Sequence, residues 1–380
     1  MVIPYTLPSE LRAAPLGIDW LSIPNIKASP AAQYAALLDI CQGATDACEA
    51  YIFMPARATL EVEMLDTPNY RAVIMANQCM RVQTRHWPVS SVLGAMITPS
   101  AGFPRQWHAI PTVNMSVVEP ITRFVGESSL GPSLAGNINE IDIAPGYGDW
   151  SQGRIGYQIQ VAYIAGWPHC GMLPTAVVQA TFVASSADVT VSDTASLVVG
   201  AGVSGTGVPD GTTIVSLTSS SVTLSQAVTW SGTDYLRQGV APGATSLLVD
   251  DVTALESTSP LVREGAWSES VRVNSAAATA PVSILNDTVT ANVGPGEVTL
   301  VNPTLYPHAP ATCIISALPA NVRWASYYYA AAEALSRGAT AITAQALPGS
   351  LTGSGGGAKG LAGSFIAQAE QRLSPLRRVI

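Results

Sequence analysis

The stretch from residue 318 to residue 338 constrains the fold more than any other part of the chain. It reads LPANVRWASYYYAAAEALSRG, with a proline where a helix begins, a glycine just past its end and alanine-rich sequence between them. Apolar side chains cover this predicted helix except for a narrow polar strip formed by Arg323, Ser326, Glu333 and Arg337. Such a helix must be covered from more than one side. The covering surface belongs either to its own domain or to a neighbouring subunit, and the stretch alone favours neither.

The composition of the chain is that of a globular protein. Its 380 residues are enough for two or three domains, and 48% of them are hydrophobic while 12% are charged. No apolar run approaches the roughly 20 residues that span a bilayer, and the N-terminus lacks a basic region followed by an apolar segment. We therefore expect no membrane partner and no export signal. The five scattered cysteines are expected to be free thiols of a protein made in a reducing cytoplasm.

The negative charge is concentrated in one segment. Residues 175–316 contain eleven acidic residues and three arginines, a surplus that equals the net charge of −8 of the whole chain. Residues 317–380 contain two acidic and six basic residues and form the only basic part. A surface that binds DNA tightly needs clustered lysine and arginine. The charge balance argues against such a surface. It is compatible with a surface along which DNA passes without being bound.

Helical and strand periodicities follow one another along the chain. We expect residues 1–28 to form an extended arm, residues 30–53 an amphipathic helix, and residues 126–153 a loop. The expected strands in this part are 57–64, 70–74, 79–84, 91–97, 106–110 and 157–165. From residue 175 onward, short runs of Val, Thr and Ser between turn residues predict two all-β modules, 175–239 and 240–317.

Five short segments carry a resemblance to a known family. They are RHWPVSSV (85–92), Trp107 in RQWHAIP, GRIGYQIQVAYIAGWP (153–168), the helix that opens with LPANV (318–339) and LSPLRRV (373–379). In this order they resemble the head-to-tail connector adaptor proteins of long-tailed bacteriophages. The resemblance covers residues 29–168 and 318–380. About 150 residues intervene where simple members of that family have almost none.

The resemblance implies an α+β fold, with a small helical core and a β-sheet or hairpin, interrupted by an inserted all-β region of two modules. The expected parts are the N-terminal part of the adaptor core with its arm, helix and strands (1–174), module 1 (175–239), module 2 (240–317) and the C-terminal part of the core (318–380). The last part would hold the long helix, a Gly-rich linker and a docking arm. Such an insertion is tolerated where the chain's two ends are close together, so residues 166–168 and 318–319 should be neighbours.

The function that the resemblance implies is structural, without enzymatic activity. The chain would be made in the host cytoplasm and reside in the neck of the virion, where about twelve copies form a ring beneath the portal. The ring would extend the channel through which the genome is ejected, without sequence-specific DNA binding. Its partners would be further copies of this chain, the portal protein and the next neck or tail-completion protein.

The resemblance also implies where these partners bind. In the family the C-terminal arm engages the portal, and we assign this role to an apolar helical stripe and the basic end that follows it. The assigned residues are Leu361, Phe365, Ile366, Ala369, Leu373, Leu376, Arg377, Arg378, Val379 and Ile380. Contacts between subunits of the ring are expected from the apolar helix, at Trp324, Tyr327, Tyr328, Leu335 and Arg337.

No sequence motif predicts a cofactor, a metal ion or a catalytic centre. Residues 200–205 match G-x-G-x-x-G, but the TGVPDGTT that follows cannot open the helix that a dinucleotide site requires. His169 with Cys170 and His308 with Cys313 flank the intervening region, and would offer a tetrahedral zinc site if they met. Their spacing is not that of known metal motifs, so we expect no cofactor and no metal.

The alternative function is that of a β-rich carbohydrate-binding or adhesion protein, on a phage fibre or a cell surface. In that case residues 181–317 would bind sugars and the helical part would only anchor them. The two tryptophans of this region, Trp230 and Trp267, are the candidates for stacking on a sugar ring.

Overall fold

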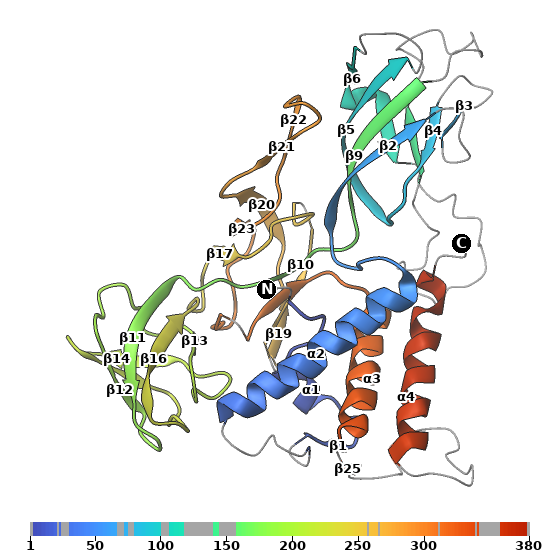
Figure 1. Ribbon diagram of the computed structural model, residues 1–380. Helices are drawn as coiled ribbons and strands as arrows, with labels where there is room; N and C mark the ends of the chain where they lie inside the picture. Colours follow the sequence, from blue (N-terminus) through green and yellow to red (C-terminus); the bar gives the residue numbers. More distant parts are fainter. Residues whose placement is uncertain are drawn as a thin grey trace.

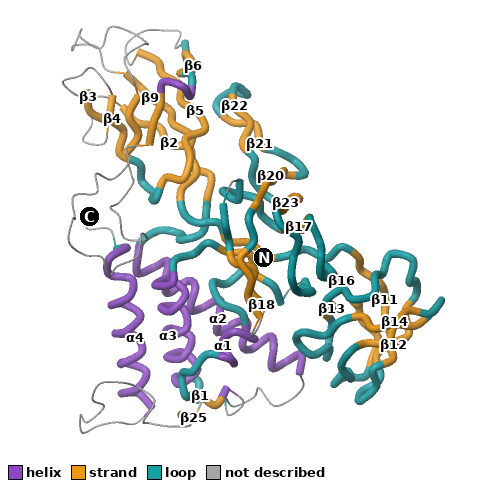
Figure 2. The backbone as a smooth tube through the Cα atoms, turned by 180° about the vertical axis from the view of Figure 1, so that it is seen from behind, coloured by secondary structure: helices purple, strands orange, loops and turns teal. Residues whose placement is uncertain are grey.

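The computed structural model describes residues 3–20, 23, 30–66, 72–74, 80–99, 106–117, 140–143, 157–256, 258–264, 267–310, 312–338, 340–341 and 358–377. Within these ranges the helices gather at one end of the molecule, and antiparallel sheets make up the rest (Figures 1 and 2). None of the described helices combines the length and the apolar character needed to cross a bilayer.

The expected α+β fold, a small helical core interrupted by an inserted β region, is wrong. The described chain is mostly β, with many antiparallel sheets and only four α-helices. Part of the error concerns the strands before residue 166. They form two four-stranded sheets, whereas a single sheet or hairpin was expected. Alternation along the sequence identified most of these strands, but it carries no information on how many sheets they build.

The helical end contains α1 (Pro8–Ala13), α2 (Pro30–Ile52), α3 (Ala320–Ser336) and α4 (Ala358–Leu373). The helices expected at 30–53 and 319–337 are confirmed as α2 and α3. α3 packs against both α2 and α4 (Figure 1). The apolar residues of α3 that this packing buries are Val322, Ala325, Ala330, Ala331, Ala334 and Leu335. Much of the apolar surface of α3 is therefore covered by its own chain.

The N-terminal segment is packed, and the expectation of an extended arm is wrong for residues 3–20. Tyr5 and Leu11 are fully buried. The backbone N–H of Tyr5 donates to Thr45 Oγ1 (2.9 Å), and its hydroxyl donates to Glu49 (2.6 Å). Both acceptors lie on α2, so this segment is fixed to the outer helix of the bundle.

Two four-stranded sheets share one core beyond the helices. The first has the order β2 (Thr59–Asp66), β9 (Tyr157–Ala165), β5 (Val89–Pro99), β6 (His108–Ile110). The second has the order β3 (Ala72–Ile74), β4 (Met80–Gln83), β8 (Glu140–Ile143), β7 (Met115–Val117). We call these two sheets the half-barrel; its buried residues include Met80, Val82, Ile97, Ile141, Ile143, Ile159 and Tyr163. β8 lies in the stretch 126–153 that was expected to be loop, and that expectation is wrong for residues 140–143.

A six-stranded sheet forms a lobe to one side of the molecule (Figure 1). Its order is β13 (Val203–Ser204), β16 (Gly232–Gln238), β11 (Ala176–Phe182), β12 (Asp188–Val191), β15 (Ser221–Leu224), β14 (Ile214–Leu217). Its own apolar core includes Phe182, Val189, Val222 and Leu236.

Two further sheets lie in the middle of the molecule, and the last two strand pairs lie outside them (Figure 1). A four-stranded sheet has the order β10 (His169–Gly171), β24 (Ile314–Ser316), β18 (Leu261–Glu264), β19 (Trp267–Ser270). A three-stranded sheet has the order β17 (Ser246–Val249), β23 (Gly296–Leu300), β20 (Val273–Ala278). Two-stranded pairs are formed by β21 (Val282–Ile284) with β22 (Val289–Ala291), and by β1 (Ile18–Asp19) with β25 (Thr340–Ala341).

The β10–β24 pair joins the two ends of the region between residues 168 and 318. His169 lies opposite Ser316, and the N–H of Ala317 donates to the carbonyl of Pro168 (2.8 Å). The expectation that residues 166–168 and 318–319 are neighbours is confirmed.

The β21–β22 hairpin rests on the half-barrel. Its turn residues Leu285, Asn286 and Asp287 all have positive φ angles, which makes the turn tight. Leu285 packs with Met96 of β5. A Cβ on Gly94 of β5 would lie 2.7 Å from Val289 Cγ2 and 3.2 Å from Leu285 Cδ1. The hairpin therefore packs against β5 at Gly94, the position where this strand has no side chain.

Replacing Gly94 with alanine is expected to lower the free energy of unfolding by about 1 to 3 kcal/mol, because the new methyl group overlaps Val289. Chemical denaturation measures the effect. The matched control is Gly43→Ala on the exposed side of α2, where a Cβ meets nothing within 4 Å and should stabilise the helix. Equal stability of Gly94→Ala and the wild type would show that the hairpin does not rest on β5.

Candidate functional site

The segments that carry the resemblance meet where the helices join the half-barrel. The N–H of Gly166 donates to the carbonyl of Pro88 (2.8 Å), and the N–H of Trp167 donates to the carbonyl of Ala56 (3.0 Å). The rings of Trp87 and Trp167 pack edge to face with centroids 6.4 Å apart. Two of the five segments, RHWPVSSV and YIAGWP, are thus held together by backbone and side-chain contacts.

Two further segments contribute to the same place, which we call the motif junction. Leu318 and Val322, from LPANV, share a buried core with Trp87. Leu373 and Leu376, from LSPLRRV, belong to this core as well. The fifth segment lies apart, since Trp107 packs in a small cluster on the half-barrel with Met96 and Leu285. Four of the five segments therefore build one structural unit.

Gly166 of YIAGWP is required by the geometry of the junction. Its φ angle is 97°, and a Cβ would lie 2.4 Å from the carbonyl oxygen of Arg57. A side chain fits neither this backbone conformation nor this space. The glycine lets the chain turn out of β9 while it stays hydrogen-bonded to the segment before β2.

Four of the seven described residues assigned to portal docking lie inside the chain's own core. The buried ones are Phe365, Ala369, Leu373 and Leu376. Leu361 is half-buried, whereas Ile366 is 40% exposed. The exposed Arg377 stacks its guanidinium over the rings of Tyr51 (5.0 Å) and Phe53 (5.6 Å). Arg378, Val379 and Ile380 lie outside the described residues. In this structure the stripe packs within the chain, and portal binding stays a prediction.

The residues assigned to ring contacts form an aromatic row on α3. Trp324, Tyr327 and Tyr328 are half-buried, and Leu335 is buried. Trp324 packs edge-on against Tyr327 with centroids 5.4 Å apart, and Tyr328 stacks on Phe365 of α4. Arg337 is exposed and makes ion pairs with Asp39 (2.7 Å) and Glu333 (2.8 Å). Part of this aromatic surface stays open to solvent, and a neighbouring subunit could cover it.

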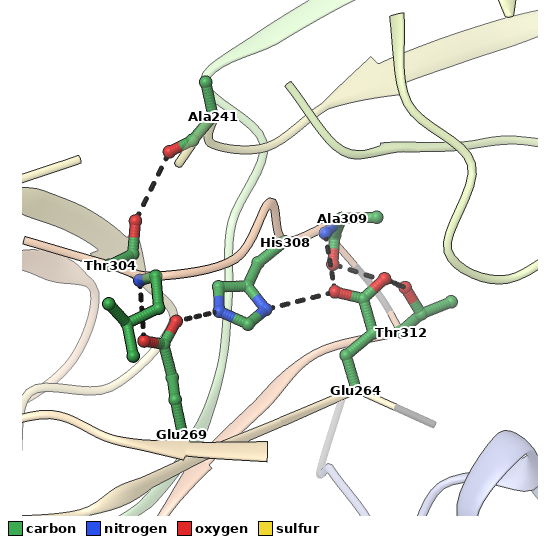
Figure 3. Close-up of polar contacts among 8 residues, drawn as sticks. Ala241, Glu264, Glu269, Thr304, His308, Ala309 and Thr312 are labelled. Carbon is green, nitrogen blue, oxygen red and sulfur yellow. Dashed lines mark hydrogen bonds and ion pairs between the residues drawn. The ribbon is translucent and has the colours of Figure 1, made fainter. Parts of the chain in front are cut away.

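A buried polar cluster around His308 is the second place with unusual chemistry (Figure 3). His308 is fully buried and lies between Glu264 at the end of β18 and Glu269 of β19. Its Nε2 is 2.6 Å from Glu269 Oε1, and its Nδ1 is 3.2 Å from Glu264 Oε2. Glu264 also accepts from Thr312 Oγ1 (3.2 Å), and Glu269 accepts from the N–H of Leu305 (2.7 Å).

Opposing effects set the charge of His308. Burial lowers the pKa of its imidazole, but the hydrogen bonds and negative charges of Glu264 and Glu269 raise it, and the net pKa is raised. The cluster therefore favours an imidazolium between two carboxylates. The neighbouring thiol of Cys313 has a pKa raised well above its usual value, chiefly by burial and next by the charge of Glu264.

The four residues considered for a zinc site do not converge. The ring nitrogens of His169 lie 3.0 Å from Ser316 Oγ and 3.0 Å from the carbonyl oxygen of Pro4. The thiol of Cys170 donates to the carbonyl of Ile315 (3.7 Å). Only His308 and Cys313 come together, and Glu264 joins them.

Sequence reasoning missed both glutamates of this cluster. Glu264 and Glu269 reach His308 because β18 and β19 pair in a register that faces Val262 with Glu269. It also missed the buried ion pair nearby, in which Arg263 Nη1 lies 2.6 Å from Glu10 Oε1. The only sequence signal was an Arg-Glu pair within an otherwise apolar strand, and strand partners are not visible in such a pattern.

The residues of the G-x-G-x-x-G match and Trp230 both have structural roles in the six-stranded lobe. Residues 200–205 contain β13, and the next element is the strand β14, not a helix. A Cβ on Gly202 would lie 2.5 Å from the carbonyl carbon of His308, so this glycine allows the lobe to approach the polar cluster. Trp230 packs against Phe182 with centroids 6.1 Å apart. The side chain of Trp267 lies outside the described residues.

The two candidate places differ in character. The motif junction is an apolar core at which distant segments meet, whereas the His308 cluster is buried, polar and rich in potential ligands. Comparisons with family models, with curated proteins and with solved structures find no match for this chain.

Acid should destabilise the protein in part through His169. Burial, and next the charge of Arg263, lower the pKa of His169 to about 3. The unfolded chain takes up a proton near pH 6.5 and the folded chain does not, so stability falls as the pH drops from about 6.5 toward 3. One such group contributes a slope of up to about 1.4 kcal/mol per pH unit. Urea unfolding between pH 4 and 7 should show a shallower slope for His169→Gln. The exposed His108 gives the control variant His108→Gln, and equal slopes for wild type and His169→Gln would contradict the prediction.

Proposed function

We propose that this chain is a virion structural protein, the head-to-tail adaptor that forms a ring beneath the portal of a long-tailed phage. The observation that carries the proposal is the motif junction. Four segments that resemble the adaptor family, spread from residue 85 to residue 379, contribute to one core.

The work of such a protein is geometric. The helical end would face the portal and the neighbouring subunits, because the exposed Ile366 and Arg377 on the C-terminal segment and the aromatic row of α3 lie there. The acidic sheets would project from the ring, where added mass is tolerated. DNA would pass through the channel without being bound, which is consistent with the absence of basic clusters in residues 175–316.

The carbohydrate-binding alternative loses support from the position of Trp230. Its ring packs on Phe182 and lies where a Cβ on Gly232 would be, so this partly buried side chain packs against the core of the lobe. Binding of a glycan to the intact protein would revive this alternative.

Electron microscopy of the purified protein tests the proposal. Mixed with phage heads that carry a portal but lack this chain, the protein should add a disc beneath the portal or form rings of about a dozen subunits. Heads that bind none of the protein, at concentrations well above those in an infected cell, would refute the adaptor role.

A single exposed residue tests the docking end more sharply. Ile366→Glu should leave the fold intact, since this side chain is 40% exposed, but should weaken binding to heads by about tenfold or more. Gln371→Glu places the same charge elsewhere on the exposed surface of α4 and serves as the control. If both variants bind heads as the wild type does, this part of α4 does not dock on the portal. Circular dichroism verifies that both variants are folded.

A further inference from the structure

We propose that Glu264, His308 and Cys313 form a binding site for a divalent transition metal, with Zn²⁺ as the best fit. This inference is independent of the adaptor role. The three side chains are buried, and one potential ligand atom from each lies within 4.8 Å of the others. Among the described residues, no other group of three such side chains meets this condition.

The spacing of the ligand atoms fits a tetrahedral ion. Glu264 Oε2 and His308 Nδ1 are 3.2 Å apart. Two ligands bound to zinc at about 2 Å with tetrahedral angles are separated by about 3.3 Å. An ion between these atoms would replace their hydrogen bond without displacing either side chain far. Cys313 Sγ, which belongs to the same group of ligand atoms within 4.8 Å, supplies the third ligand.

Glu269 contacts His308 on the side of the ring that faces away from Glu264. Its Oε1 lies 2.6 Å from Nε2, the ring nitrogen that faces away from Glu264. A histidine that binds a metal through one nitrogen usually donates the other N–H to a carboxylate, which fixes the ring and makes it a stronger ligand. Glu269 is therefore a positioning residue, and Glu264, His308 and Cys313 are the ligands.

The donor set indicates which ion would fit. A transition metal binds thiolate and neutral imidazole, so binding would be coupled to the release of any proton that a ligand atom carries. The mixture of thiolate, imidazole and carboxylate suits Zn²⁺ or Co²⁺, whereas Mg²⁺ and Ca²⁺ prefer oxygen ligands only.

A cavity adjoins the site at Glu264. Its volume is about 430 Å³, and Ser9, Arg12, Asp210 and Thr212 line it as well. Of the three ligands Glu264 alone lines it, so an ion or a water molecule as fourth ligand would approach from the Glu264 side.

The bound ion would fasten the segment that leads into α3. Cys313 directly precedes β24, and β24 is followed by the first residues of the LPANV segment. Glu264 belongs to β18, which pairs with β24. The metal would therefore cross-link a strand to the loop before its partner strand, and should raise the unfolding temperature of the full-length protein.

The test is the metal content of the protein produced in medium supplemented with Zn²⁺ and purified without chelator. The wild type should retain about one zinc per chain, and Cys313→Ser should retain less than a tenth of that. Cys170→Ser is the matched control, because Cys170 is buried in the same apolar core but lies outside the cluster, and it should retain zinc as the wild type does. Wild-type protein without zinc, or equal loss of zinc in both variants, would overturn the proposal.

Cobalt supplies a readout that does not depend on the variants folding. Wild-type protein produced with Co²⁺ should show the near-ultraviolet charge-transfer absorption of a thiolate bound to cobalt. Its absence would overturn the site even if every variant were insoluble. Glu269→Gln should keep this absorption but lose about 10- to 100-fold in zinc affinity, as expected of a residue that only positions His308. Unchanged affinity would remove Glu269 from the proposal.

Discussion

The three paired positions between β10 and β24 are the contact on which the rest of the structure depends. They close a loop of about 145 residues, and closing a loop of that length costs entropy that only cooperative contacts offset. The carbonyl of Pro168 then accepts from Ala317, which places the end of β9 beside the start of α3. The segments that flank the half-barrel strands, with Ala56, Trp87 and Trp167, consequently pack with the helices although the chain leaves and returns between them.

Elements with strong local periodicity were predictable from the sequence. α2 and α3 appear where proline, alanine and regularly spaced apolar residues placed them, and β9 appears where alternation placed it. α1 was not predictable, because six residues carry too little periodicity and its Glu10 is held by Arg263, more than 250 positions away in the chain. β8 was hidden for a similar reason, since its four residues lie among glycines and prolines and become a strand by pairing with β4 and β7.

The polar cluster shows the same division between local and distant information. That His308 and Cys313 lie close together followed from their separation of five residues. The glutamates that complete the cluster come from β18 and β19, and their approach to His308 depends on strand register. The C-terminal helix gives a third case, in which the apolar stripe was identified correctly as a stripe. Which surface it covers was not encoded in its spacing, and Phe365 lies against Tyr328 of the same chain.

The seat of the β21–β22 hairpin on Gly94 has a mechanical consequence. The chain enters the half-barrel between α2 and β2 and leaves it between β9 and β10, and both crossings lie at its base, where attachment at one end alone would permit rotation (Figure 1). The hairpin touches the same sheet farther along β5, so it adds a second point of support at a distance from the first. Contacts at two separated points prevent the half-barrel from rotating about either point alone. The half-barrel then transmits torque to the sheets below it instead of swinging freely.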